Sequence, residues 1–190
     1  MKINKEQEII KILFKDFLNS YNSRNISRLV GLSHAGAFKI LKKLKEREIV
    51  KPKQIGKAII YSINLDNPVA YREVEMALTI EAWNYKRWVE EFKVLEDKSD
   101  IVILFGSILI NEKLANDIDI LVVAKKNMFG EIIKIIKEKN EISNKKIHLI
   151  LQSPADFKKD INSKNKAIIE IIKKGIVLFG QDNFRKSVKI

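Results

Sequence analysis

The chain has 190 residues, of which 46% are hydrophobic and only three are prolines, so it can bury a core along its whole length and extensive disorder is excluded. The absence of cysteine excludes disulfides and thiolate metal sites, and no apolar run approaches the roughly 20 residues that cross a membrane, so we expect a cytoplasmic protein without membrane contact. The formal net charge of +12 is concentrated near the start, where residues 1–69 hold 14 Lys and Arg against 6 Asp and Glu, as nucleic-acid binding would require.

The first third of the chain alternates amphipathic helical segments with short polar breaks, and then changes to strand patterns. Apolar residues recur at helical spacing on the third segment, where Ala37, Leu41 and Leu44 form an inward stripe. The predicted elements are a helix at 5–18, a helix at 26–30 that Asn25 or Ser27 caps, a helix from the Ser33 cap to about Arg47, and a hairpin of strands 49–53 and 58–63 that turns at Gly56.

A short helix, a Gly-containing turn, a basic helix and a hairpin form the pattern SRNISRLVGLSHAGAFKILKKLKEREIVKPKQIGKAIIYSI. This pattern resembles the winged helix-turn-helix domains of bacterial and archaeal transcription regulators. In that family the third helix enters the major groove of duplex DNA and the hairpin, or wing, touches the backbone or minor groove. The resemblance implies base contacts from Ser33, His34, Gly36 and Lys39, and phosphate contacts from Lys42, Lys43, Lys53 and Lys57.

Two other interpretations of this first segment stay open. The lysines would in one case merely solvate a small helical domain, and in the other the winged domain would mediate protein contacts.

A long helix is predicted next, from Pro68 to about Glu96. Its apolar stripe includes Trp83 and Trp88 and needs a surface to cover it. Packing on the C-terminal domain and a homodimer interface are both consistent with this pattern. The predicted domains are a winged helix-turn-helix domain at 1–67, a connecting helix at 68–98 and a third segment at 99–190.

The stretch from Ile101 to Val123 carries the strongest chemical signal, IVILFGSILINEKLANDIDILVV. Asp117 and Asp119 stand two apart in a strand pattern, so both carboxylates share one face. Paired carboxylates supply the oxygen ligands that Mg²⁺ takes together with substrate phosphates. Gly106 lets the backbone approach a phosphate, and Ser107 offers an N–H and a hydroxyl at a predicted helix start.

Gly-Ser, a spacer of roughly ten residues and Asp-x-Asp together resemble the signature of the polymerase β nucleotidyltransferase superfamily, closest to its minimal members. The resemblance implies that Gly106 and Ser107 hold the triphosphate of a nucleoside triphosphate (NTP), and that Asp117 and Asp119 are catalytic ligands of Mg²⁺. The family also has a third carboxylate on a later strand, which completes the metal site and activates the acceptor hydroxyl. The spacer here lacks the usual central glycine, and Asn116 stands where serine commonly precedes the first aspartate.

The rest of the chain alternates helices and strands, which favours one mixed sheet and an α+β fold overall. We expect a helix at 129–139, a strand at 146–151, a helix at 156–174 broken near 162–164, and a final strand at 175–180. The strand at 146–151 carries His148 where the third carboxylate is expected. His148 either ligates a metal or accepts a proton from the acceptor hydroxyl, or it fills a place whose chemistry has been lost.

Two functions follow as hypotheses. In the first, the chain is a DNA-binding enzyme that binds NTP and Mg²⁺ and transfers a nucleoside monophosphate to a hydroxyl of a protein, a nucleic acid or a small molecule. In the second, it is a transcriptional regulator whose nucleotidyltransferase-like domain is inactive and serves to bind an effector or to dimerise. The intact Gly106, Ser107, Asp117 and Asp119 favour the first hypothesis, and His148 favours the second.

Overall fold

The computed structural model describes residues 3–188, and the chain divides into two compact units, Met1–Ile80 and Glu81–Ile190. Helices and strands occur in both units, so the predicted α+β class is confirmed. No helix within residues 3–188 is long and apolar enough to span a lipid bilayer.

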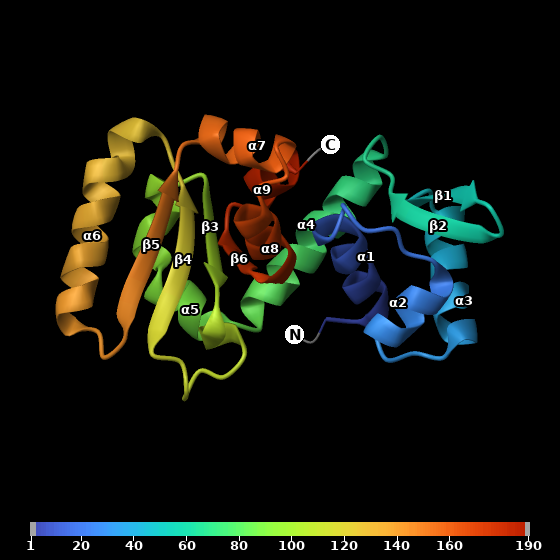
Figure 1. Ribbon diagram of the computed structural model, residues 1–190, viewed down its shortest axis with the longest axis horizontal. Coiled ribbons are helices and arrows are strands. Elements are labelled where there is room, and N and C mark those ends of the chain that lie inside the picture. The colour runs from blue at the N-terminus through green and yellow to red at the C-terminus, as the bar shows by residue number, and fades with distance from the viewer. Residues whose placement is uncertain (1–2, 189–190) are drawn as a thin grey trace. The chain divides into compact units, whose positions relative to one another are not determined.

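The first unit contains three helices followed by a two-stranded antiparallel hairpin, which is the arrangement predicted for this part of the chain (Figure 1). A fourth helix begins in this unit. The elements are α1 (Lys5–Lys15), α2 (Ser23–Leu29), α3 (His34–Glu46), β1 (Val50–Ile55), β2 (Ala58–Ile63) and α4 (Pro68–Trp83).

Helix α3 begins and packs as its sequence predicts. The Ser33 hydroxyl accepts a hydrogen bond from the Gly36 N–H at 3.1 Å, which satisfies one of the free N–H groups of the first turn. Ala37, Leu41 and Leu44 are completely buried, so the predicted inward stripe is confirmed.

Helix α2 begins earlier than predicted. Its N-cap is Asn22, whose side chain accepts a hydrogen bond from the Asn25 N–H at 2.9 Å. The prediction that Asn25 or Ser27 caps this helix is therefore wrong. Ser27 lies inside the helix and donates its hydroxyl to the Arg24 carbonyl, so its side chain bonds backward along the chain rather than capping.

The predicted continuous helix from Pro68 to Glu96 is divided. Helix α4 ends at Trp83, and Asn84 and Tyr85 form a turn in which their N–H groups bond to carbonyls three residues earlier. Beyond the turn Trp88 is buried, whereas Trp83 before it is 52% exposed. A homodimer through this segment stays a prediction.

The second unit is a four-stranded mixed sheet with helices on both faces (Figure 1). The strand order is β5-β4-β3-β6, with β4 and β5 parallel and β3 antiparallel to both β4 and β6. The elements are α5 (Lys86–Glu91), the short 3-10 helix η1 (Lys93–Lys98), β3 (Ile101–Phe105), η2 (Ser107–Leu109), β4 (Asp117–Val123), η3 (Lys126–Met128), α6 (Phe129–Ile142), β5 (Lys146–Gln152), α7 (Pro154–Asn162), α8 (Lys166–Lys174), β6 (Ile176–Phe179) and α9 (Gln181–Ser187).

One part of the core of this unit lies on the sheet face where Trp88 of α5, the adjoining Phe92 and Ile132 of α6 pack against apolar side chains of the strands. On β4 the residues of this face are Ile118, Ile120 and Val122. The intervening residues of β4 point to the opposite face because side chains alternate along a strand. Helix α7 contacts β5 and helix α8 contacts β3.

Candidate functional site

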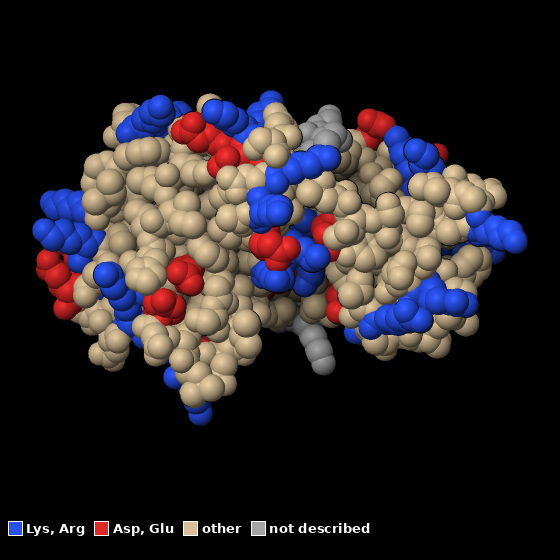
Figure 2. All heavy atoms as spheres, viewed as in Figure 1, with Lys and Arg blue, Asp and Glu red and all other residues tan. Residues whose placement is uncertain are grey.

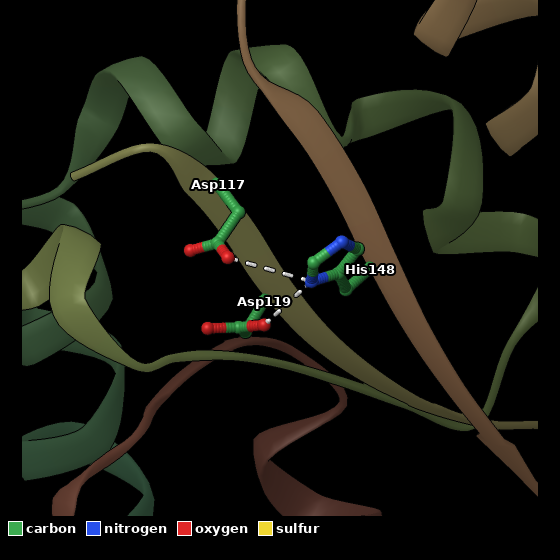
Figure 3. Close-up of side chains that lie close together, drawn as sticks. All are labelled: Asp117, Asp119 and His148. Carbon is green, nitrogen blue, oxygen red and sulfur yellow. Dashed lines mark ion pairs between the residues drawn. The ribbon is translucent and has the colours of Figure 1, made fainter.

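Strand β4 places Asp117 and Asp119 on the sheet face opposite to Ile118 and Ile120, as the alternation predicts. Strand β5 runs parallel to β4, and its register sets His148 directly beside Asp119. The three side chains point toward one another from the two neighbouring strands (Figure 3). The two strands therefore assemble the site from positions 29 or more residues apart in the chain.

The three side chains converge closely enough to share one ligand. The His148 Nδ1 atom lies 3.5 Å from an oxygen of Asp117 and 3.5 Å from an oxygen of Asp119. One donor atom from each residue lies within 4.8 Å of the other two. The side chains are 35%, 24% and 49% exposed for Asp117, Asp119 and His148, so the cluster opens to solvent on one side. Within residues 3–188 no other group of three such side chains converges in this way.

The turn at Gly106 is packed directly against this cluster. Gly106 has φ +85°, a conformation that disfavours other residues, and a Cβ atom at this position would lie 2.1 Å from Asp119 Oδ2. The turn and the second carboxylate are thus in immediate contact. The predicted helix start at Ser107 coincides with the beginning of the three-residue 3-10 helix η2. Ser107 is exposed beside the turn.

The electrostatics of the cluster are those of a site that attracts cations. Burial raises the pKa of the Asp119 carboxyl above its ordinary value, and the neighbouring Asp117 carboxylate raises it further, while His148 opposes both effects. Figure 2 shows acidic atoms grouped on the surface over β4, with basic atoms beside them. Two carboxylates and one imidazole are donors that divalent cations accept, so the chemistry of the cluster fits a metal ion.

Strand β5 is at the edge of the sheet and is held by a side chain of α6. The Asn140 side-chain amide donates to the Ile147 carbonyl at 3.2 Å, and its oxygen accepts from the Ile147 N–H at 2.7 Å. These two bonds satisfy the outer backbone groups of the residue that precedes His148. The role of Asn140 was not predicted, because nothing in a helical pattern identifies the strand that a side chain will reach.

The spacer between Gly106 and Asp117 is fixed at several points. Asn111 accepts hydrogen bonds from the N–H groups of Lys113 and Leu114. Lys145 Nζ donates to the Ala115 carbonyl, and Ala115 is buried. The spacer therefore has a defined path although it lacks the usual central glycine.

Three charged residues near the predicted site differ in how close they come to it. Lys146 is the register partner of Asp117 and is exposed, and it was not predicted although it stands two residues before His148 on the same strand face. Asp156 lies on α7, where its carboxylate and its N–H both bond to Ser153, and Glu141 lies on α6. Neither acid joins the cluster, so His148 alone among the described residues occupies the third position.

A sequence model of the family described as polymerase beta, nucleotidyltransferase matches residues 89–184. The chain belongs to this family. The match contains the whole sheet, the Gly106 turn and the three clustered side chains, and it confirms the nucleotidyltransferase resemblance of the C-terminal segment.

Two further comparisons add the following. No curated protein matches the chain. Among solved structures the chain is similar to a cysteine-to-serine mutant of Lactococcus lactis ZitR, with 14% identity, a TM-score of 0.38, and coverage of 71% of this chain and 73% of that chain.

The residues predicted to contact DNA are all on α3, its cap or the hairpin, and several of the α3 group already have partners within the first unit. Ser33 caps α3 at Gly36, and His34 Nε2 lies 2.8 Å from the Ser23 hydroxyl of α2. Lys43 pairs with Glu6 of α1 at 3.0 Å. The contacts of His34 and Lys43 were not predicted, because they join segments that are distant in the sequence.

The other lysines predicted to contact DNA have fewer partners within the first unit. Lys42 is 3.9 Å from Glu46 on the same helix. Within the part of the chain that the structure describes, Lys39, Lys53 and Lys57 make no ion pair and are exposed. Figure 2 shows basic atoms over α2 and over the tip of the β1–β2 hairpin. The structure thus brings the predicted residues to one helix and one hairpin of the first unit.

Proposed function

We propose that the second unit binds a nucleoside triphosphate together with Mg²⁺, and that the first unit binds duplex DNA. The observation that carries the nucleotide proposal is the contact between the Gly106 turn and Asp119, the second carboxylate of the cluster. A backbone turn without a side chain and two carboxylates meet at one solvent-open point. Phosphates and a cation that neutralises them require the same two features side by side.

In this proposal the chain's own groups have distinct tasks. The backbone at Gly106 and the N–H and hydroxyl of Ser107 hold the triphosphate, and Asp117 and Asp119 hold the cation. The cation supplies neutralisation of charge on the phosphates. The carboxylates are already oriented by the β3–β4 and β4–β5 pairings, so little reorganisation is needed on binding.

We further propose transfer of a nucleoside monophosphate to a hydroxyl. The hydroxyl oxygen forms a bond to the α-phosphorus, the bond between that phosphorus and the bridging oxygen to the β-phosphate breaks, and pyrophosphate leaves with that oxygen. The hydroxyl proton needs an acceptor. His148 is the base nearest to the paired carboxylates and takes that role in the active form of the proposal.

A second candidate function is favoured by His148 itself. The family resemblance implies a carboxylate at this position, and an imidazole there replaces a negatively charged ligand by a neutral one. In this case the second unit binds a nucleotide without transferring it, and the chain acts as a DNA-binding regulator. The two candidates share nucleotide binding and differ in turnover.

Calorimetric titration with non-hydrolysable ATP and GTP analogues, with and without Mg²⁺, tests nucleotide binding. The chain should bind at least one analogue in a Mg²⁺-dependent manner, and Asp117→Asn with Asp119→Asn should abolish that dependence. Glu138→Gln with Glu141→Gln is the matched control, because it removes two exposed acids from α6 with the same change in charge. Equal binding by the Asp117/Asp119 variant and the wild type would refute the assignment.

Turnover separates the two candidates. Incubation with NTP, Mg²⁺ and candidate hydroxyl acceptors should release pyrophosphate in the first candidate and should release none in the second. Metal-dependent binding without any pyrophosphate release in the presence of the chain's native target would establish the regulator.

A further inference from the structure

The third position of the metal site holds a nitrogen donor instead of an oxygen donor. His148 presents Nδ1 to both carboxylates, at 3.5 Å from each. The side chain is half exposed, and its ring points between Asp117 and Asp119 (Figure 3). The chain has no cysteine and only two histidines, so His148 is the one soft or borderline donor near the site among the described residues.

The two distances from His148 Nδ1 to the carboxylates fit ligands around one ion better than a strong hydrogen bond. With metal–donor bonds of about 2.1 Å, neighbouring donors lie about 3.0 Å apart in an octahedron and about 3.4 Å apart in a tetrahedron. The observed 3.5 Å needs only a small contraction. An N–H···O hydrogen bond is usually shorter than about 3.2 Å, so the imidazole is poorly placed to be a mere hydrogen-bond partner of the carboxylates.

Donor chemistry decides which ion such a set prefers. Mg²⁺ is a hard cation that favours oxygen ligands in a regular octahedron and keeps several of its waters. Imidazole suits first-row transition ions, and three protein donors with open positions are typical of sites where such an ion also meets a substrate. Two carboxylates with one imidazole are therefore better matched to a transition ion than to Mg²⁺.

We propose that His148 makes this nucleotidyltransferase site one that takes a first-row transition dication such as Zn²⁺ or Mn²⁺ in preference to Mg²⁺, with Nδ1 as a direct ligand. The inference rests on the proposed nucleotide site, because Asp117 and Asp119 serve both. It concerns the ion alone and holds without bound nucleotide. It replaces the proton-acceptor role of His148, because an imidazole whose Nδ1 lone pair binds an ion carries its proton on Nε2 and has no free lone pair for another.

Nuclear magnetic resonance of the tag-free full chain with ¹⁵N-labelled histidine tests direct ligation without any substitution. His34 lies on α3 and bonds to Ser23, so it serves as an internal control. Zn²⁺ should shift the His148 ring signals, and Mn²⁺ should broaden them, while both ions leave those of His34 unchanged. Unchanged His148 signals at saturating Zn²⁺ and Mn²⁺, or equal changes at both histidines, would overturn the proposal.

Calorimetry with each ion alone tests the preference. Wild-type protein should bind Zn²⁺ more tightly than Mg²⁺, and His148→Asp should lower the ratio of the two affinities by about 10-fold or more, because even the outer partners of metal ligands contribute that much. His34→Gln should leave the ratio unchanged. The same ratio in His148→Asp and wild type, with folding verified by circular dichroism, would show that His148 does not select the ion.

The two proposals fail in different experiments. Loss of nucleotide binding with intact Zn²⁺ ligation at His148 contradicts the nucleotide proposal and supports the metal inference. Mg²⁺-dependent nucleotide binding with no response of His148 to Zn²⁺ or Mn²⁺ supports the former and refutes the latter.

Discussion

The two units use their polar side chains in different ways. On α3 of the first unit, side chains predicted to meet DNA also hold the unit together, as Lys43 does with Glu6 and His34 does with Ser23. On β4 and β5 of the second unit, Asp117, Asp119 and His148 face mainly one another, and backbone pairing positions them. A surface position on a helix predicts that a side chain is exposed, but not that it is free to bind a partner. Strand register, in contrast, predicts which side chains converge.

The convergence of side chains in the second unit depends most strongly on the Gly106 turn, and Gly106→Ala should have the largest effect. A Cβ atom would overlap the Asp119 carboxylate and the residue would keep a left-handed φ, so we expect a loss of about 2–5 kcal/mol in the unfolding free energy of the second unit and loss of nucleotide binding. Denaturant unfolding and calorimetry measure the two effects.

Gly56→Ala is the matched control for this change. Gly56 has φ +58°, but no atom of the described residues outside its immediate chain neighbours lies within 4 Å of the place that a Cβ would take. The substitution therefore isolates the backbone cost, about 1 kcal/mol, from the steric one. Equal losses at the two glycines would show that the contact with Asp119 has no energetic weight.

Asn140→Ala tests whether the edge strand needs its side-chain clamp. The substitution leaves the N–H and carbonyl of Ile147 without their partner, and we expect a decrease of about 2 kcal/mol in the free energy of unfolding. Because β5 carries His148, the same variant should also weaken ion binding. Asn144→Ala, on the exposed loop that follows α6, should have no effect on either property, and an equal effect there would remove Asn140 from the site.

The salt dependence of DNA affinity tests whether the lysines of α3 and the hairpin are free to contact DNA. Lys39→Ala, Lys53→Ala and Lys57→Ala together remove charges without ion pairs among the described residues, so DNA affinity should fall roughly tenfold. The slope of log affinity against log salt should decrease by about 0.9 for each phosphate that is no longer neutralised. Lys42→Ala with Lys43→Ala should have a smaller effect for each lysine because both side chains have acidic neighbours.

The control for these variants removes three exposed lysines from the second unit, Lys134, Lys137 and Lys158. An unchanged salt slope after removal of Lys39, Lys53 and Lys57 would show that these lysines of α3 and the hairpin do not contact the DNA backbone.

The smallest expected effect is at Tyr21, which precedes α2. Burial and a hydrogen bond to Asp16 raise the pKa of Tyr21 to about 12, against about 10 in the unfolded chain. The folded protein therefore keeps this proton where the unfolded chain loses it, and the associated stability disappears as pH rises from about 10 to about 12. Tyrosinate absorbance should show a late titration step that Tyr21→Phe removes, and its persistence in that variant would assign the step to another tyrosine.

Sequence alone predicted what depends on local pattern. Alternation along a strand put Asp117 and Asp119 on one face, and helical spacing identified the buried side of α3. The close approach at Gly106 was also predictable, because glycine before a serine at the end of an apolar run permits a turn that other residues resist.

Features that depend on pairing between distant segments could not be predicted in this way. The family resemblance placed His148 at the third position, but the register between β4 and β5 that also sets Lys146 beside Asp117 has no local signal in the sequence. The turn at Asn84–Tyr85 interrupts an apolar pattern that predicts one helix, and it accompanies the burial of Trp88 in the core of the second unit. Helix α9 has seven residues, too few to give a clear period.

The position of His148 on β5 has an evolutionary consequence. The codons for histidine and aspartate differ only in their first base, so one point mutation exchanges the imidazole for a third carboxylate. The backbone that carries it is already aligned with Asp119 and needs no insertion or new fold. Under the proposal that His148 selects the ion, a single mutational step is therefore enough to change the ion that the site prefers.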